Sequence, residues 1–277
     1  MTYTIRFNDW QADVCPRLGA NVTALRHKGK DVLRPLLDEK QLDIDPYLQG
    51  APLLFPANRT KDGRFTWQGK NYQMPINEEI SGGNLHGFLH FQAFSVDCIT
   101  ENAVTMSYNH TADAYFPFAF MFTVTYRVDA NGFTATYTVK NTDKTAFPFT
   151  FATHTTFVEP DRFSAPIESR QERDARLIPT GRYVPLTAEE QRYVKDGISK
   201  GNAIVGYYKA NGHTAFVGEY TYTVSDNFDH YILYNGKGVS GFLCVEPQSG
   251  AVDGLNIAGG HNVIQIGEAM TFTQNIH

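Results

Sequence analysis

Short runs of alternating apolar and polar residues, separated by turn residues, are the feature of this sequence that most constrains its fold. The clearest pair spans residues 120–141, FMFTVTYRVDANGFTATYTVKN, where Asn131-Gly132 separates two such runs. Successive side chains of a strand point to opposite faces, and Asn-Gly readily forms a two-residue hairpin turn. Similar turn residues stand at 61–64 (KDGR), 68–70 (QGK) and 234–238 (YNGKG). The pattern predicts an all-β protein built of antiparallel strands.

Helical periodicity is nearly absent, and nothing divides the chain into parts. The one helix signal is LTAEEQRYVKDG, residues 186–197, where Thr187 and Glu190 fit a capping box and Gly197 can end the helix. A hydrophobic content of 42% supports a large core, and an aromatic content of 13% favours strands. No repeat of fixed period, low-complexity tract or linker interrupts the 277 residues. We therefore predict one domain over residues 1–277, a large antiparallel β-sandwich.

Charge, the first residues and the cysteines exclude several classes of protein. The net charge of −5 is spread along the chain without the basic stripe that a nucleic-acid backbone requires, so we expect no nucleic-acid partner. The start MTYTIRFNDW has no signal-peptide pattern, and the longest apolar stretch, FPFAFMF at 116–122, is far shorter than the roughly 20 residues that span a membrane. We predict a soluble cytoplasmic protein with no membrane contact. Cys15, Cys98 and Cys244 form no CxxC pair and are predicted to be buried free thiols.

One predicted strand carries a histidine on a face of small residues. In TFATHTTF, residues 150–157, an extended chain directs Phe151, Thr153 and Phe157 to one side, and His154 points to the other side with small neighbours. A single histidine in a strand is often a hydrogen-bonded structural residue. The pattern leaves open what this imidazole faces.

Three further places interrupt the apolar pattern with polar residues. Asn58-Arg59 follows an apolar run in LLFPANRT, and the guanidinium offers a planar fork of donors for paired oxygens. Glycines surround His86 in GGNLHGFLH, which allows close approach to a ligand. His86 and His90 have a zinc-like spacing, but the glycines argue against a helix and no third ligand is near in sequence, so no metal site is predicted. Glu246 ends an apolar run in FLCVEPQSGAVDGLN. Solvated surface residues are the ordinary alternative for each.

Taken in order, these motifs resemble the aldose 1-epimerase (galactose mutarotase-like) family. The resemblance rests on PLLFPANRTKDGRFTWQGKNYQMPINE, NLHGF, THTTF and VEPQSGAVDGLN, and it extends to IQIGEAMTFTQNI near the end of the chain. It implies a β-supersandwich with an open, concave sugar cleft. His154 matches the general acid of the family and Glu246 its general base. Arg59 and His86, with Asn58 beside them, match residues that bind the substrate.

The chemistry of anomer exchange fits these groups. Opening the ring of an aldose requires removal of the proton from the C1 hydroxyl and protonation of the ring oxygen. A glutamate that is ionised at neutral pH can take the first proton, and an imidazolium with a pKa near 6.5 can supply the second. The reaction needs no metal, cofactor or covalent nucleophile. The sequence therefore predicts an isomerase that interconverts the α and β anomers of a hexose or related aldose.

One departure from the family pattern and two alternative functions stay open. The family usually carries a sugar-binding aspartate between the histidine and the glutamate, but residues 202–212, NAIVGYYKANG, contain no acid, so the identity of the sugar stays open. A hexose-6-phosphate 1-epimerase of the same fold is an alternative, because Arg162, Arg170, Arg173 and Arg176 cluster in sequence; acidic residues interleave with them, which favours a solvated mixed-charge loop. A non-catalytic carbohydrate-binding protein is a second alternative. Monomer and homodimer both stay open.

Overall fold

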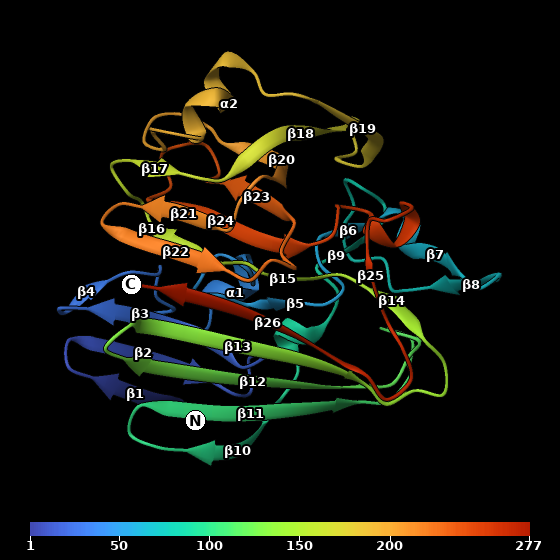
Figure 1. Ribbon diagram of the computed structural model, residues 1–277, viewed down its shortest axis with the longest axis horizontal. Coiled ribbons are helices and arrows are strands. Elements are labelled where there is room, and N and C mark those ends of the chain that lie inside the picture. The colour runs from blue at the N-terminus through green and yellow to red at the C-terminus, as the bar shows by residue number, and fades with distance from the viewer.

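Two large antiparallel sheets form the body of the protein in a computed structural model that describes all residues 1–277 (Figure 1). Neighbouring strands of the first sheet follow the order β10 (Ser95–Ile99), β11 (Ala103–His110), β12 (Phe120–Asp129), β13 (Gly132–Asn141), β26 (Ala269–Ile276), β22 (Tyr220–Val224), β21 (Thr214–Val217) and β17 (Phe163–Ser164). Ala130 and Asn131 connect β12 to β13, with Asp129 paired to Gly132, so the turn lies one residue before the predicted Asn131-Gly132. Buried and less buried residues alternate along both strands. The predicted hairpin and the antiparallel all-β class are confirmed.

The second sheet contains the glutamate strand and the stretch 150–157, which was predicted as one strand but is divided into two short strands with His154 and Thr155 between them. Its order is β19 (Pro179–Pro185), β18 (Ile167–Arg173), β20 (Val205–Ala210), β23 (His230–Tyr234), β24 (Phe242–Ser249), β15 (Phe151–Thr153) and β5 (Leu53–Leu54), and β16 (Thr156–Val158) also pairs with β24. All eight residues of β24 are buried. A strand that is buried on both faces is covered on each side. One face of β24 therefore packs against the core, and its other face is covered by other segments of the chain.

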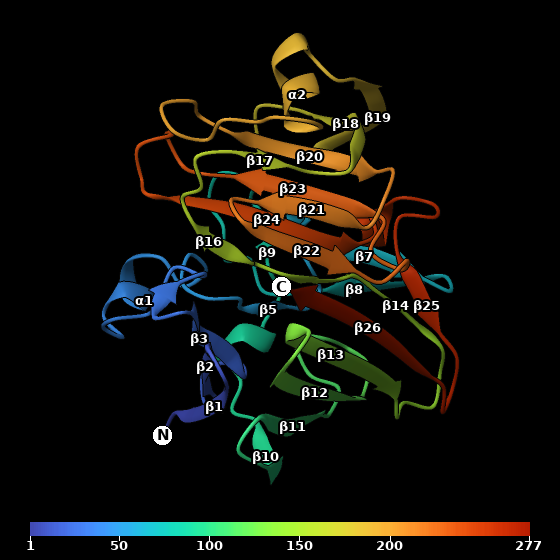
Figure 2. The same ribbon diagram turned by 60° about the vertical axis from the view of Figure 1, so that its left-hand side comes forward.

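Smaller sheets and short helices complete the fold. β1 (Tyr3–Phe7), β2 (Trp10–Cys15), β3 (Asn21–His27) and β4 (Lys30–Asp31) form a four-stranded sheet near the N-terminus (Figure 2). Two-stranded pairs are β6 (Arg59–Thr60) with β9 (Asn84–Leu85), β7 (Arg64–Trp67) with β8 (Lys70–Gln73), and β14 (Phe147–Phe149) with β25 (Asn262–Ile264). Short 3-10 turns cover Lys61–Gly63, Leu89–Phe91 and Gly254–Asn256.

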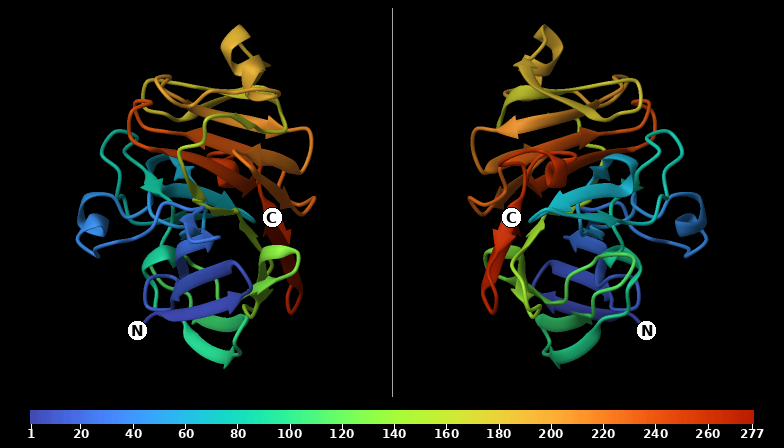
Figure 3. Two further views of the ribbon diagram at one scale, coloured as in Figure 1. Left: turned by 90° about the vertical axis from the view of Figure 1, so that its left-hand side faces the viewer. Right: turned by 90° about the vertical axis from the view of Figure 1, so that its right-hand side faces the viewer.

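Two short α-helices stand at the margins of the sandwich (Figure 3). α2 (Ala188–Tyr193) begins at the predicted capping box, in which Thr187 and Glu190 bond each other's backbone N–H groups. The helix ends before Gly197, which instead bridges to Phe163. α1 (Gln41–Ile44) was not predicted, because a single turn carries no apolar periodicity.

An aromatic core lies between the two large sheets. One cluster of 53 buried hydrophobic residues runs from Ile5 to Ile276. At its centre, the ring of Phe151 on β15 contacts the rings of Phe122, Tyr137 and Phe272 on the first sheet, with centroids 5.1–5.3 Å apart. A continuous core favours the predicted single domain, which stays a prediction. No helix of the chain is long and apolar enough to cross a membrane.

The three cysteines are free thiols, but they do not share one environment. Cys15 and Cys244 are buried as predicted, whereas Cys98 is exposed. The prediction was wrong for Cys98 because this residue lies on β10, an edge strand with an irregular register between Val96 and Cys98. An edge strand has only one neighbour and leaves more of its surface to solvent.

Candidate active site

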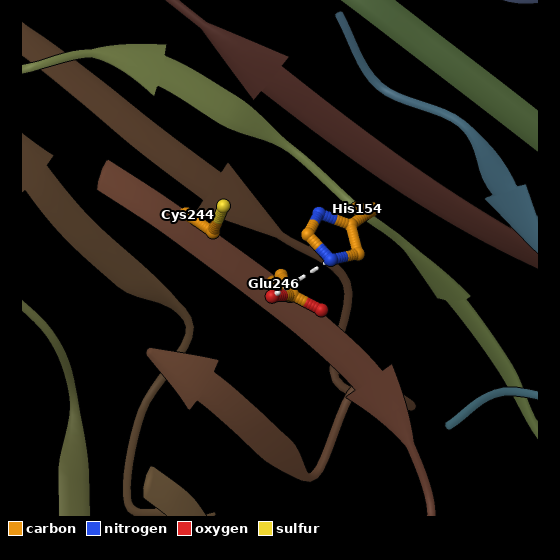
Figure 4. Close-up of side chains that lie close together, drawn as sticks. All are labelled: His154, Cys244 and Glu246. Atoms are coloured by element: carbon orange, nitrogen blue, oxygen red, sulfur yellow. Dashed lines mark ion pairs between the residues drawn. The ribbon is translucent and has the colours of Figure 1, made fainter. Parts of the chain in front are cut away.

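His154, in the short connection between β15 and β16, faces Glu246 on β24 (Figure 4). Ala152 pairs with Gln248, and Thr156 pairs with Cys244, so the antiparallel register places residue 154 opposite residue 246. Side chains that are directly opposite on one face of a sheet lie close together. The Nε2 atom of His154 is 3.5 Å from the Oε1 atom of Glu246, and the two residues are 6% and 2% exposed.

His154 lies outside the paired strands, but β15 and β16 on either side of it pair with β24 in the same register. β15 ends at Thr153 and β16 begins at Thr156. The N–H of His154 donates to the carbonyl of Pro52 at 2.9 Å rather than to β24, and the carbonyl of Thr155 accepts from Val245 at 3.0 Å. Backbone hydrogen bonds to Pro52 on one side and to Val245 on the other therefore fix the main chain that carries the imidazole.

Burial opposes the charged forms of both side chains. Desolvation lowers the pKa of His154 to about 3 and raises the pKa of Glu246 well above its usual 4.5, although the positive charge of Arg59 partly opposes the second shift. The charge states predicted from sequence, an imidazolium beside a carboxylate, are therefore disfavoured in the free protein. The neutral pair and the ion pair contain the same single shared proton, so the two residues titrate as one unit.

This pair lies at the floor of a cavity of about 250 Å³. Residues of the adjacent strands share its face of the sheet, because Val205 pairs with Tyr234, Tyr207 with Ile232, and Ile232 with Glu246. The walls come from loops and short strands, with Asp45, Tyr47, Leu48, Asn58, Arg59, Leu85, His86 and Leu177. The floor thus rests on a regular sheet, and the walls come from segments far apart in sequence.

Arg59 is placed in the wall by a dense set of hydrogen bonds. Its Nε and one terminal nitrogen donate to the two carboxylate oxygens of Glu78 at 2.7 and 2.5 Å, and the other terminal nitrogen donates to the hydroxyl of Tyr207 at 2.7 Å. Only 12% of the Arg59 side chain is exposed. Asn58 precedes it with φ +57°, a left-handed conformation that asparagine tolerates better than most residues. Asn58 and Arg59, which were predicted to bind the substrate, therefore both line the cavity.

His86 lies in the same wall and has no side-chain hydrogen bond within the protein. Its Nδ1 atom is buried without a partner, and burial together with the charges of its neighbours lowers its pKa well below 6.5. It adopts φ +61° and precedes Gly87, where any side chain would collide with the carbonyl of Phe55. A buried polar atom without a partner is costly, and such atoms often mark ligand sites.

Sequence reasoning missed the aromatic wall and the partner of Arg59. The ring of Tyr47 packs on His86 and His154, with centroids 4.5 and 6.0 Å away, and burial raises its pKa to about 12. Glu78, which binds Arg59, lies in the irregular segment before β9. Tyr47 lies outside the motifs, and Glu78 ends the motif PLLFPANRTKDGRFTWQGKNYQMPINE but was given no role. Their positions depend on tertiary packing of loops, which no local pattern encodes.

His154, Cys244 and Glu246 are the residues that could hold a metal ion, since one ligand atom from each lies within 4.8 Å of the others (Figure 4). Burial raises the pKa of the Cys244 thiol well above its usual value, so the thiolate that a metal needs is disfavoured. His86 and His90 lie on either side of Tyr47 and belong to no such group.

None of the four clustered arginines lines the cavity. Three form ion pairs, namely Arg162 with Asp196, Arg170 with Glu190 and Arg176 with Asp62. The fourth, Arg173, lies over the ring of Tyr207 at 4.9 Å and donates to the carbonyl of Val205 at 3.1 Å. The cluster forms a mixed-charge surface.

Comparisons with known proteins identify the family. The family model for aldose 1-epimerase matches residues 1–277, and the chain belongs to this family. A galactose mutarotase-like protein from Clostridium acetobutylicum has a similar structure, with a TM-score of 0.90, 22% identity, and coverage of 99% of this chain and 94% of that one. A putative aldose 1-epimerase from Escherichia coli K12 has a TM-score of 0.87, 20% identity, and coverage of 100% and 98%. The predicted galactose mutarotase-like fold is confirmed.

One curated relative is similar in sequence over part of the chain. The uncharacterized protein YihR from Escherichia coli K12 is 26% identical over 155 residues, which make up 55% of this chain. The match spans about half of that protein's length, 49%.

Proposed function

We propose that this protein is an aldose 1-epimerase that exchanges the α and β anomers of a hexose or related aldose by general acid and base catalysis. The observation that carries the proposal is the pair of His154 and Glu246, 3.5 Å apart on the floor of a cavity. The ring oxygen and the anomeric hydroxyl are bonded to the same carbon, so two proton-transfer groups must converge on one small region. Membership of the aldose 1-epimerase family supports this reading.

In the proposed reaction one proton moves onto the sugar and one moves off it. Glu246, as carboxylate, takes the proton of the C1 hydroxyl, and His154, as imidazolium, gives a proton to the ring oxygen, so that the C1–O5 bond breaks and an aldehyde forms. Transfer of the shared proton from Glu246 to His154 generates this reactive form, and the charge of Arg59 stabilises the carboxylate. After rotation about the C1–C2 bond, the reverse transfers close the ring on the other face of the carbonyl.

The walls would hold the sugar by hydrogen bonds and apolar contact. Asn58, Arg59 and His86 offer polar groups to the cavity, and Tyr47 and Tyr207 offer aromatic surface. A fixed arrangement of the substrate beside both proton-transfer groups adds to the rate that the transfers themselves provide. These roles follow from the positions of the residues in the cavity.

The test is polarimetry of freshly dissolved aldoses. His154→Asn and Glu246→Gln should each lower kcat/KM by roughly 10²–10⁴-fold, the usual contribution of a positioned proton-transfer group. His110→Asn and Glu190→Gln are matched controls, because both side chains are buried and neither lines the cavity. Optical-rotation kinetics that stay unchanged in both active-site variants would overturn the assignment.

Substrate comparison separates this proposal from its alternatives. Hexose 6-phosphates should turn over no faster than free hexoses, because three of the four clustered arginines are held in ion pairs and none of the four lines the cavity. A strong preference for the phosphates would indicate a hexose-6-phosphate 1-epimerase. A wild-type protein that binds aldoses but leaves their mutarotation rate unchanged would be a carbohydrate-binding protein.

A further inference from the structure

The cavity contains a second carboxylate that the proposed reaction does not use. Of the residues that line it, only Asp45 and Glu246 are acidic. Asp45 follows α1 directly, in the segment that stands out from one side of the sandwich (Figures 2 and 3). Tyr47 and Leu48 of the same segment also line the cavity. This segment therefore brings one acidic and two apolar or aromatic side chains to the sugar site.

Asp45 is partly buried but only partly satisfied within the protein. Its Oδ1 atom accepts a hydrogen bond from the backbone N–H of Tyr47 at 3.0 Å, a short local turn. Burial is the main reason that its pKa is raised, and the backbone N–H groups of Tyr47 and Leu48 and the nearby charge of Arg34 oppose this shift. A carboxylate has about four acceptor sites, so these two backbone groups leave about half of them free.

An aldose in this cavity needs acceptors for the hydrogen bonds of its hydroxyl groups, and Asp45 can be one of them. Arg59 bonds Glu78 and Tyr207 through three of its five N–H groups, and a guanidinium is a donor only, so it cannot accept a hydrogen bond from a sugar hydroxyl. Glu246 is committed to the anomeric hydroxyl in the proposed reaction. The remaining hydroxyl groups of an aldose are hydrogen-bond donors, and they require an acceptor in a mostly apolar cavity. Asp45 is the one other carboxylate that lines the cavity.

We propose that Asp45 is a substrate-binding residue, which accepts hydrogen bonds from one or two hydroxyl groups of the aldose other than the anomeric hydroxyl. The inference rests on the proposed epimerase function and extends it, since it locates the group that distinguishes one aldose from another. Hydrogen bonds to a charged group are stronger than those between neutral groups, and a site built for a hydroxyl discriminates against a sugar that lacks it.

Asp45→Asn tests this role against a purely structural one. An asparagine keeps a side-chain oxygen for the turn to Tyr47 and removes the charge and one acceptor oxygen. We expect KM for the preferred aldose to rise about 10- to 100-fold, with kcat changed less than about threefold. Asp43→Asn is the matched control, because Asp43 is exposed on α1 and does not line the cavity, and its KM should stay unchanged. An unchanged KM for Asp45→Asn, or a loss confined to kcat, would overturn the proposal.

Deoxy sugars identify the hydroxyl and keep the test independent of protein folding. With the wild-type protein, one member of a series of deoxy aldoses should show a KM raised by a similar factor. The same sugar should lose little further affinity with Asp45→Asn, because the two changes remove one interaction. Additive losses in this cycle would contradict the contact. If wild type shows no mutarotation at all, the epimerase function itself fails, and the same cycle measured by calorimetric sugar binding still tests Asp45.

Discussion

The two faces of the chain between Phe151 and Phe157 differ in how completely their polar groups are satisfied. On the core face, the hydroxyl of Thr153 is 2.9 Å from that of Thr155, which is 3.0 Å from the hydroxyl of Tyr222. The side-chain amide of Gln274 donates to Thr153 at 2.8 Å. These groups form a closed network inside an apolar core.

On the cavity face, the polar groups of the same stretch do not form a closed hydrogen-bond network. The Nδ1 atom of His154 has one distant contact, the hydroxyl of Thr156 at 3.5 Å, and its Nε2 atom faces Glu246 at 3.5 Å. A closed buried network fixes a structure, whereas incompletely bonded groups beside a cavity are available to a ligand. The comparison teaches that hydrogen-bond satisfaction, more than burial, separates the structural face from the functional one.

The largest expected effect is a loss of activity, without a matching loss of stability, after a substitution on the cavity face. His154→Asn should reduce mutarotation by roughly 10²–10⁴-fold, because the proton donor to the ring oxygen is lost. The free energy of unfolding should change by less than about 1 kcal/mol, since this imidazole makes no strong hydrogen bond that folding depends on. Polarimetry and urea denaturation measure the two quantities. A large loss of stability with activity retained would reverse the assignment of the two faces.

The core face should respond in the opposite way. Tyr222→Phe removes the hydroxyl that contacts Thr155 at 3.0 Å and should cost about 1–3 kcal/mol of unfolding free energy. kcat/KM should stay within about twofold of wild type, because the ring keeps its place in the core and does not line the cavity. Phe216→Tyr, at an exposed position of β21, is a control that should change neither quantity. A strong loss of activity in Tyr222→Phe would show that the two faces are coupled.

A smaller effect is a gain of stability when the buried carboxyl is neutralised. The unfolded chain releases the proton of Glu246 above pH 4.5, whereas the folded protein retains it to a higher pH, so this group destabilises the fold progressively as pH rises above 4.5. Glu246→Gln should therefore raise the unfolding free energy by about 0.5–2 kcal/mol near neutral pH and by little at pH 4. Thermal unfolding at both pH values checks this. An equal change at both would indicate that packing, not ionisation, is responsible.

The smallest effect concerns the acid limb of the activity profile. Because burial lowers the pKa of His154 to about 3, kcat/KM should change little between pH 5 and 7, where a free imidazole would titrate. Activity should fall at higher pH when the pair loses its shared proton, at a pH set by the raised pKa of Glu246. Polarimetry in a series of buffers measures both limbs. An acid limb centred near pH 6.5 would mean that the imidazole is solvated in the working protein.

Local sequence patterns predicted the strands well, because alternation and turn residues act over a few positions. The same alternation correctly separated His154 from the phenylalanines behind it. The proximity of His154 to Glu246 could not be predicted from spacing, since it depends on which strands pair, and only the family resemblance suggested it. The pKa shifts of the pair depend on desolvation in the folded state, so no local pattern could predict that burial disfavours the imidazolium and the carboxylate.

The cavity walls were predicted unevenly for a related reason. Arg59 and His86 lie in short motifs rich in glycine and turn residues, and these motifs carried the resemblance. Asp45 and Tyr47 lie in a segment without periodicity, whose place over the sheet is decided by tertiary contacts. Residues 202–212 were noted for lacking an acid, and the structure shows that Tyr207 from this stretch binds Arg59.

The pairing of Ala152 with Gln248 and of Thr156 with Cys244 has a consequence for how the protein is made. If β24 settled one residue out of step, Thr155 would stand opposite Glu246, and the carboxylate would turn toward the phenylalanine-rich interior while the imidazole kept the cavity face. Such a molecule would be compact yet inert. Under the proposed function, correct pairing of this sheet is what brings the two proton-transfer groups together, so turnover per molecule is expected to report on folding quality.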